Sequence, residues 1–344
     1  MKKIGILTIN GNHNCGNKLQ NYALKIYLEK MGFNVETVWI EKKLSKIISF
    51  IKNIIKRYLL KDNARYLKFI KFNNEYLNVK YYTNNQISNK YDYFIVGSDQ
   101  VWNYNFKEFN QNMFLSFSPQ KKNIAYAASF GVDKIEDKFK NIFIQGLKNI
   151  KYISVRENQG QEIIKNLMNF KPEILIDPTM LIEKDEWDKI STKPKELKTE
   201  KYILTYFLGN ISKEKRKEIE KIAQENNCEI IELLNKKSPF YSCGPKEFIY
   251  LEKNAFLICT DSFHSSIFAL LYNIPLIIFD RDDNEKNMNS RLETFITKFQ
   301  LENHKFTDKI TNDNLKYNYT KAHKTLAVEK DKSRKFLEKA LNIK

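Results

Sequence analysis

Short apolar runs bounded by turn residues alternate with segments of helical periodicity along most of the chain. The first runs, 2–9 and 35–40, flank a polar loop at 10–17 and a helical pattern that ends at Gly32. This order of strand, loop, helix and strand is typical of α/β proteins with a parallel sheet. Further strands of the first half are predicted at 93–96, 124–128, 152–155 and 174–176.

A second set of alternating elements follows the charged, Pro194-containing stretch 183–200, which we predict to be a linker. Its strands are predicted at 202–207, 229–233, 256–260 and 275–279. We therefore predict an α/β fold of two doubly wound domains, 1–190 and 200–318, with strand ends lining a central cleft. Residues 319–344 have a basic helical pattern, and one arrangement open to them is to pack back on the first domain.

Residues 44–90 interrupt the first domain. The pattern LSKIISFIKNIIKRYLL at 44–60 is amphipathic and basic, so such a helix could lie on an anionic membrane surface. Packing against the domain body is the commoner arrangement of an amphipathic helix, and we favour it. Residues 61–90 are polar and rich in Asn and Tyr, and we expect a looped excursion.

Composition is that of a soluble globular protein, with 42% hydrophobic and 29% charged residues among 344. The formal net charge of +17 is compatible with nucleic acid, an anionic membrane or small acidic substrates as partners. The excess is mostly Lys and is scattered, which argues against nucleic acid. The four cysteines form no C-x-x-C pair and no signal peptide or membrane span is predicted, so we expect a reduced cytoplasmic protein. The four histidines are far apart, and no metal site is expected.

The stretch FLICTDSFHSSIFALL, residues 256–271, carries the clearest candidate for chemistry. A buried strand is predicted to end at the capping pair Asp261-Ser262, so that His264 lies at the start of a helix. The backbone N–H groups of Ser265 and Ser266 and the helix dipole would favour an anion there. An imidazole at this point could move a proton onto or off an anionic substrate. The alternative is an ordinary first-turn residue with a structural hydrogen bond.

Other polar residues follow predicted strands of the first domain. Ser98 and Asp99 come after the strand 93–96, where α/β proteins place ligand contacts, although an ordinary helix cap would look the same. Arg156 follows the strand 152–155 and could hold a phosphate or carboxylate with two hydrogen bonds, or pair with Glu157 or another acid. The glycines of loop 10–17 permit close approach of a ligand, but their spacing matches no phosphate-binding fingerprint.

Eight stretches together resemble the polysaccharide pyruvyl transferase family. They occur in the family's order and cover most of the chain to residue 295: ILTINGNHNCGNKLQNYAL, YDYFIVGSDQVWN, IAYAASFG, YISVRE, DPTMLI, YILTYFLG, TDSFHSSIFALL and NMNSRLETF. The resemblance implies a GT-B-like fold, with two Rossmann-like domains and an active site between them. It also implies transfer of the pyruvyl group of phosphoenolpyruvate onto two hydroxyls of a glycan sugar, forming a ketal and releasing phosphate.

The resemblance implies roles for individual residues. His264 would be the general acid, and Arg156 and Arg291 would hold phosphoenolpyruvate. Ser265, Ser266 and Arg281 are expected on the same anion-binding side. The residues expected to face the acceptor or line the cleft are Asn14, Gly16, Asn17, Ser98, Asp99 and Trp102. Beyond phosphoenolpyruvate as donor, no cofactor or metal is expected.

Two departures from the family pattern are visible: Ser265 stands where Gly is common and Cys15 where Tyr is common. The expected partners are phosphoenolpyruvate and a glycan or lipid-linked saccharide of surface polysaccharide synthesis, with peripheral contact to the inner membrane face left open. One alternative function is a nucleotide-sugar-dependent GT-B glycosyltransferase, since fold does not fix function. Another is a non-enzyme that binds nucleic acid or membrane through residues 44–90.

Overall fold

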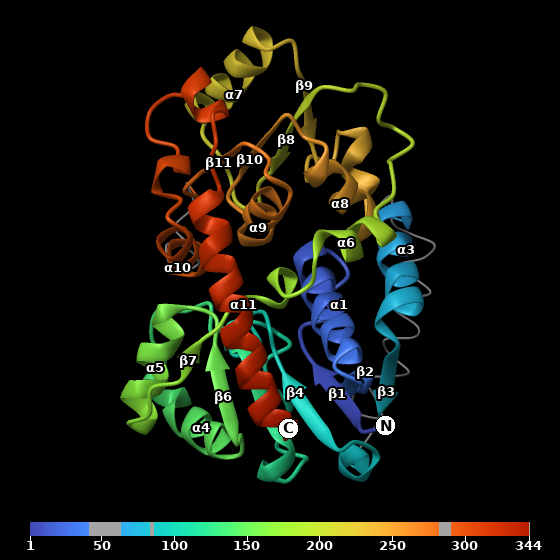
Figure 1. The fold of residues 1–344 in the computed structure, drawn as a ribbon, viewed down its shortest axis with the longest axis vertical. Helices are drawn as coiled ribbons and strands as arrows, with labels where there is room; N and C mark the ends of the chain where they lie inside the picture. Colours follow the sequence, from blue (N-terminus) through green and yellow to red (C-terminus); the bar gives the residue numbers. More distant parts are fainter. Residues whose placement is uncertain (41–62, 83–85, 282–289, 344) are drawn as a thin grey trace. The chain divides into compact units, whose positions relative to one another are not determined.

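The computed structural model describes residues 1–40, 63–82, 86–281 and 290–343. The chain divides into two compact units (Figure 1). Unit 1 comprises Met1–Ile182 and Glu329–Lys344, and unit 2 comprises Glu183–Val328. The amphipathic helix predicted at 44–60 lies outside the described residues.

Unit 1 is built on a seven-stranded parallel sheet in the order β3-β2-β1-β4-β5-β6-β7. Its strands are β1 Lys3–Leu7, β2 Asn34–Ile40, β3 Val79–Tyr82, β4 Tyr93–Val96, β5 Asn123–Ala128, β6 Tyr152–Val155 and β7 Glu173–Ile174. The predicted strands are confirmed because their apolar runs are buried between helices. Strand order reverses between β1 and β4, and loops at such a switch point commonly bind ligands.

The helices of unit 1 that bear on the site are α1, α4 and α5. In the described part of unit 1, the α-helices before the C-terminal one are α1 Cys15–Lys30, α3 Asn63–Phe72, α4 Asp137–Lys148 and α5 Asn158–Met168. The expectation of a looped excursion at 61–90 was wrong in part, since α3 forms there and β3 extends the sheet edge. Strand β3 is a partly exposed edge strand and needs few apolar residues. Its polar sequence therefore gave no signal of a strand.

Unit 2 contains a four-stranded parallel sheet in the order β11-β10-β8-β9. Its strands are β8 Tyr202–Tyr206, β9 Glu229–Glu232, β10 Leu257–Thr260 and β11 Leu276–Ile278. Its helices are α6 Lys184–Ile190, α7 Lys213–Glu225, α8 Pro245–Lys253, α9 Phe263–Tyr272 and α10 Ser290–Phe299. The predicted linker at 183–200 therefore begins with a helix, α6, whose Trp187 is fully buried and packs on Phe268.

The long C-terminal helix α11, Thr320–Leu341, begins in unit 2, and its residues from Glu329 onward belong to unit 1. Within unit 1, Tyr93 donates a hydrogen bond to the Leu341 carbonyl at 3.0 Å, and the Phe336 ring lies 6.3 Å from that of Tyr126. These contacts fix the second half of α11 against the unit 1 sheet.

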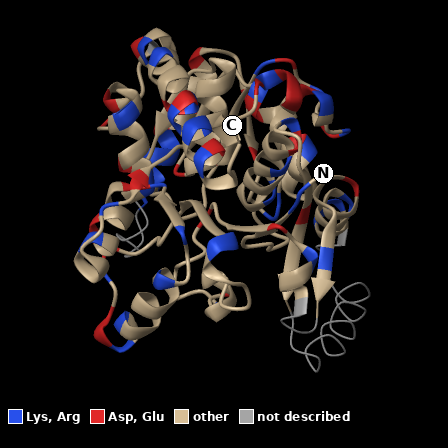
Figure 2. Ribbon diagram, turned by 60° about the horizontal axis from the view of Figure 1, so that its bottom comes forward, with Lys and Arg blue, Asp and Glu red and all other residues tan. Residues whose placement is uncertain are grey.

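Lys and Arg positions, in blue, and Asp and Glu positions, in red, both occur on the helices in Figure 2. On α11, for instance, Arg334 pairs with Asp331 and Glu338, both on the same helix. Among the described residues, the structure has no helix of the length and apolarity needed to span a membrane.

Candidate functional site

The loops after β1 and β4 are joined by polar side chains at the switch point of unit 1. Thr8 donates from Oγ1 to the Ser98 carbonyl at 3.1 Å, and Gln20 donates from Nε2 to Thr8 Oγ1 at 2.8 Å. The backbone N–H of Ser98 in turn donates to Gln20 Oε1 at 3.1 Å. The Asn17 amide donates to the Asp99 carboxylate. The structure thus brings together Asn17, Ser98 and Asp99, which come from two distant segments.

The turn after β4 depends on a glycine and on a left-handed residue. Gly97 has φ of 110°, and a Cβ there would lie 2.4 Å from the Tyr126 carbonyl oxygen, so a side chain cannot be accommodated. Asp99 has φ of 65°, a conformation that Asp tolerates better than most residues. At the other loop, Asn14 is used as the N-cap of α1, since its Oδ1 accepts from Gly16 N at 2.8 Å. Asn14 and Gly16 therefore shape the loop.

Arg156 lies within a cage of carboxylates. Its Nη1 is 2.5 Å from Asp177 Oδ2, its Nη2 is 3.5 Å from Asp99 Oδ1, and its Nε is 4.0 Å from Glu157 Oε2. The guanidinium and all three carboxylates are at most 4% exposed. Burial alone would lower the pKa of Arg156, but the charges of its three acidic neighbours raise it above the ordinary value.

The same cage ties Ser98 and the β5 turn to Arg156. Ser98 Oγ donates to Asp177 Oδ2 at 3.0 Å, and Glu157 Oε1 accepts from Ser129 Oγ and from Phe130 N, each at 2.9 Å. Pairing with Glu157 and other acids was the alternative left open for Arg156, and the structure has these ion pairs. Its predicted contact with phosphoenolpyruvate stays a prediction.

Trp102 belongs to the hydrophobic core of unit 1. Its side chain is fully buried, its Nε1 donates to the Met113 carbonyl at 2.9 Å, and its ring packs on Phe114 and Phe130. The expectation that Trp102 faces an acceptor sugar is corrected here, because a fully buried indole has no surface left for a ligand. Its place after a strand end gave no sign of this packing.

Lys18 is a buried amine that sequence reasoning missed. Its side chain is fully buried in the first turn of α1, and Nζ donates to the Asn10 carbonyl at 3.1 Å and to the Asn10 side chain. Burial lowers the pKa of Lys18 to about 7. These hydrogen bonds anchor the loop after β1 to the first turn of α1.

In unit 2 the predicted strand-to-helix turn is present. Strand β10 ends at Thr260, Ser262 caps α9, and His264 is the second residue of that helix, 6% exposed. Ser262 Oγ accepts from Ser265 N at 3.5 Å, while the Ser262 carbonyl accepts from both the N–H and the hydroxyl of Ser266, each at 3.0 Å. The prediction that the N–H groups of Ser265 and Ser266 await an anion is therefore corrected: the N-cap uses them.

Asp261 organises the switch point of unit 2, which lies between β8 and β10. One carboxylate oxygen accepts from Leu208 N at 2.7 Å, and the other accepts from Gly209 N at 2.8 Å and from Arg281 Nε at 2.9 Å. The loops after β8, β10 and β11 thus meet at one carboxylate. The sequence marked Asp261 only as a helix cap, so its role in holding Arg281 was missed.

Arg291 lies in the first turn of α10 and is 7% exposed. Phe295, four residues later and thus on the same face of the helix, packs its ring 5.8 Å from that of Phe263. Since Phe263 immediately precedes His264, this contact turns the Arg291 face of α10 toward the start of α9. His264, Arg281 and Arg291, predicted from three separate stretches, all belong to unit 2.

A buried carboxyl lies beneath the start of α9. Glu252, in the last turn of α8, is fully buried, as is Ser265 of α9. Burial raises the pKa of Glu252 well above its ordinary value, and the Ser265 hydroxyl opposes the rise. Neither carboxyl oxygen has a partner of good hydrogen-bond geometry, so the contact with Ser265 is a loose one. The predicted contact of Ser265 with phosphoenolpyruvate stays a prediction.

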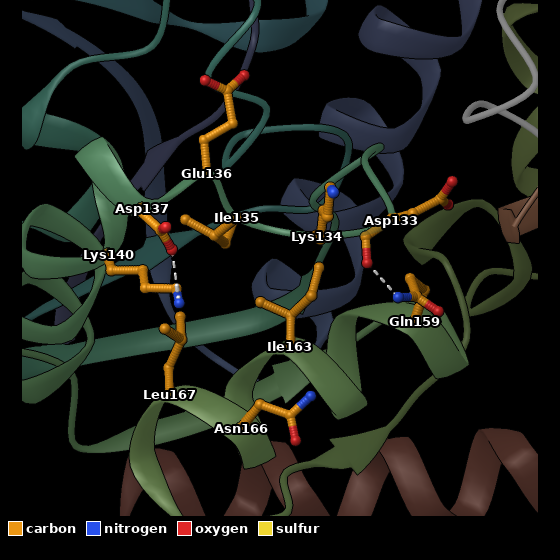
Figure 3. A pocket seen from close by; sticks show the side chains of 10 residues that line it. All are labelled: Asp133, Lys134, Ile135, Glu136, Asp137, Lys140, Gln159, Ile163, Asn166 and Leu167. Carbon is orange, nitrogen blue, oxygen red and sulfur yellow. Dashed lines mark hydrogen bonds and ion pairs between the residues drawn. The ribbon is translucent and has the colours of Figure 1, made fainter.

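Figure 3 shows a pocket of about 480 Å³ in unit 1, between the loop at 133–137 and helices α4 and α5. Charged side chains form its rim, where Lys140 pairs with Asp137 at 2.7 Å. Ile163 and Leu167 contribute apolar lining. Its lining includes none of the residues predicted for the site.

Residues 14–283 match a family model described as polysaccharide pyruvyl transferase. No curated protein matches the chain. Among solved structures, UDP-GlcNAc 2-epimerase from Neisseria meningitidis is similar at 12% identity and a TM-score of 0.47, with 100% of both chains covered. MurG from Acinetobacter baumannii is similar at 10% identity and a TM-score of 0.39, over 97% of this chain and 95% of that one. The two parallel sheets themselves are those of a GT-B-like α/β architecture with two Rossmann-like sheets.

Proposed function

Because this chain belongs to the polysaccharide pyruvyl transferase family, we propose that it moves the pyruvyl group of phosphoenolpyruvate onto a glycan sugar. Membership implies a transferase with a glycan acceptor. The donor, the ketal product and the residues that act on them are our proposal. The observation that carries it is the group of cationic and titratable side chains at the strand ends of unit 2.

The donor anion is assigned to the start of α9. Phosphoenolpyruvate carries a phosphate and a carboxylate, so its site needs fixed positive charge. Arg281 is held in place by Asp261, Arg291 lies on the face of α10 turned toward α9, and the positive end of the α9 dipole adds to both. Asp261 thereby fixes the position of the Arg281 guanidinium at the strand ends of unit 2.

His264 is assigned as the general acid. It donates a proton to the methylene carbon C3 of the enol, and C2 becomes cation-like. One sugar hydroxyl attacks C2, the C2–O bond to phosphate breaks, and the second hydroxyl closes the ketal. Of the two hydroxyl protons, one returns to His264 and the other leaves with phosphate. Proton transfer by a positioned group accelerates such a step roughly 10²–10⁴-fold.

The acceptor is assigned to the polar switch point of unit 1. Asn17, which is only partly buried, offers an amide that can bind sugar hydroxyls, and the buried Asp99 carboxylate holds this amide in place. Here we depart from the sequence-based prediction for Arg156: the guanidinium fixes Asp99 and Asp177, and the donor is assigned to unit 2.

The test is phosphate release from phosphoenolpyruvate with candidate glycans, followed by NMR of the product. The wild type should release phosphate only with acceptor and give a pyruvate ketal. His264→Gln should lower kcat roughly 10²–10⁴-fold without a change in Tm. The matched control is His323→Gln. His323 is in the same unit, at the start of α11, and its ring bonds to the side chain of Asn273, the C-cap of α9, so the kcat of this variant should equal that of the wild type.

Two results would contradict the proposal. Full activity in His264→Gln would remove the assigned acid, and stabilisation by UDP or GDP with none by phosphoenolpyruvate would indicate a nucleotide-sugar glycosyltransferase instead. Ligands that bind the folded state raise Tm by mass action, so a thermal shift separates these donors.

A further inference from the structure

The pocket of Figure 3, which we call the α4–α5 pocket, is built at the carboxyl edge of the unit 1 sheet. Part of its lining, residues 133–137, follows β5, and the rest comes from α4 and from α5, the helix that follows β6. The carboxyl ends of parallel strands share one edge of a sheet, and β4, β5 and β6 are neighbours. The pocket is therefore on the same edge as the polar switch point to which the acceptor is assigned.

A short stretch of chain joins the switch point to the pocket. The backbone N–H of Ser129 donates to the Asp99 carbonyl at 2.9 Å, so the loop after β5 starts beside the loop after β4. Asp133 follows Ser129 by four residues, and their Cα atoms therefore lie within about 14 Å of each other. A chain of a few sugar rings is long enough to cover this distance.

The loop that forms one wall of the pocket is held in place at three points. Gln159 of α5 donates from its side-chain amide to the Asp133 carbonyl, and Tyr104 donates from its hydroxyl to the Lys134 carbonyl at 3.2 Å. Ile135 is buried and belongs to the core of unit 1. The wall therefore has a fixed shape, as the walls of small-molecule sites usually do.

The other wall is one face of α5, which combines apolar and amide side chains. The residues that line the pocket from α5 are Gln159, Ile163, Asn166 and Leu167, which share a face because they follow helical spacing. Ile163 and Leu167 form an apolar floor continuous with the core. Amides can donate to and accept from hydroxyl groups, and an apolar floor can pack against the C–H face of a sugar ring.

The charges of the lining nearly cancel. Its three acids and two lysines, which are Asp133, Lys134, Glu136, Asp137 and Lys140, give a formal charge of −1. Asp137 pairs with Lys140 at 2.7 Å, whereas Asp133 has no ion pair within the described residues. On a chain of net charge +17, this pocket thus has no excess of positive charge. Its lining favours a neutral ligand over one that carries phosphate.

We propose that the α4–α5 pocket is a second glycan subsite, which binds neutral hexose units of the acceptor chain near the sugar that receives the pyruvyl group. This inference rests on the proposed function. With such a subsite the enzyme selects a glycan chain over a free sugar, because contacts with remote parts of a substrate add to its binding energy.

Acceptor length tests the subsite. We expect kcat/KM of the wild type to be higher for a hexasaccharide than for a disaccharide of the same glycan. Asn166→Trp fills the pocket from an exposed position of α5, and it should lower the hexasaccharide-to-disaccharide ratio of kcat/KM about 10-fold or more. Asp133→Ala, which adds no volume, should lower this ratio in the same direction. The matched control is Lys165→Trp, since Lys165 is exposed on α5 outside the lining, and its ratio should equal that of the wild type.

A binding measurement without turnover separates this inference from the proposed function. In isothermal titrations of the wild type with maltose, maltohexaose and the corresponding galactose oligosaccharides, we expect the longer chain of at least one series to bind more tightly. Asn166→Trp should remove this gain. If the wild type does not turn over phosphoenolpyruvate but the gain is present, the proposed function fails and the subsite stands.

Two results would overturn the proposal. One is a wild type in which neither kcat/KM nor affinity increases with chain length, or a gain that is equally large in Asn166→Trp. The other is tighter binding of decyl maltoside than of maltohexaose that is lost in Asn166→Trp, because the pocket would then bind a lipid chain.

Discussion

The two units present opposite electrostatics at the carboxyl ends of their sheets. In unit 1, one guanidinium, that of Arg156, meets three buried carboxylates. In unit 2, one carboxylate, that of Asp261, orients Arg281 and two loop N–H groups, while Arg291 and His264 lie nearby on α10 and α9. Arg156 is thus enclosed by acids from three turns, whereas Arg281 contacts the Asp261 carboxylate that also binds two loop N–H groups.

Buried polar groups also have different structural roles in the two units. In unit 1 they tie together three turns, after β1, β4 and β5, with hydrogen bonds and ion pairs of 2.5–3.5 Å. In unit 2 the Asp261 carboxylate joins the loops after β8, β10 and β11 and binds the Arg281 guanidinium. We infer that unit 1 supplies a rigid polar surface suited to a neutral sugar, and unit 2 the charge suited to an anion.

The largest effect is expected for Arg156→Ala. Removing the guanidinium leaves Asp99, Glu157 and Asp177 buried and mutually repulsive, so the free energy of unfolding should fall by about 3–5 kcal/mol in urea titrations. Adding Asp177→Asn should restore part of the loss, because it removes one uncompensated charge. A decrease in the free energy of unfolding of less than about 1 kcal/mol is typical of an exposed ion pair, and it would contradict the burial of Arg156 among three acids.

A smaller effect, graded with pH, is expected for Lys18. Its pKa is about 7 in the folded protein and near 10.5 when unfolded, so unfolding takes up a proton between these values. Stability contributed by Lys18 is therefore present above pH 10.5 and is lost as pH falls toward 7, with a slope of at most about 1.4 kcal/mol per pH unit. Unfolding curves of Lys18→Met should lack this slope.

Lys25→Met is the control for Lys18, since Lys25 is on the same helix but pairs with Glu29 at 2.7 Å. Its stability should keep the wild-type dependence on pH. Parallel pH curves for the wild type and Lys18→Met would show that the Lys18 amine titrates as an ordinary surface lysine.

Most of the fold could be predicted from the sequence, because strands buried in a parallel sheet have continuous apolar sequences. The runs at 2–9 and 256–260 are examples, and both became central strands. The edge strand β3 and helix α6 were missed, since an edge strand needs little apolar sequence and α6 is short and charged around Trp187.

The site was predictable only in part. The types of residue at strand ends predicted the positions of His264 and Arg281 in the fold, but not what surrounds each group. The pairing of Arg156 with Asp177, 21 residues away, and the burial of Glu252 both depend on tertiary packing. The partner of a buried charge is set by which turns meet in space, and a single sequence does not record this.

The most direct test of the account is a thermal shift with phosphoenolpyruvate on the wild type, Arg281→Met and Arg156→Lys. Arg281→Met removes a cation from unit 2, whereas Arg156→Lys keeps the charge within its cage of acids. The account predicts that phosphoenolpyruvate raises Tm of the wild type and of Arg156→Lys and has little effect on Arg281→Met. A shift that survives in Arg281→Met and disappears in Arg156→Lys would place the donor on unit 1 and contradict the account.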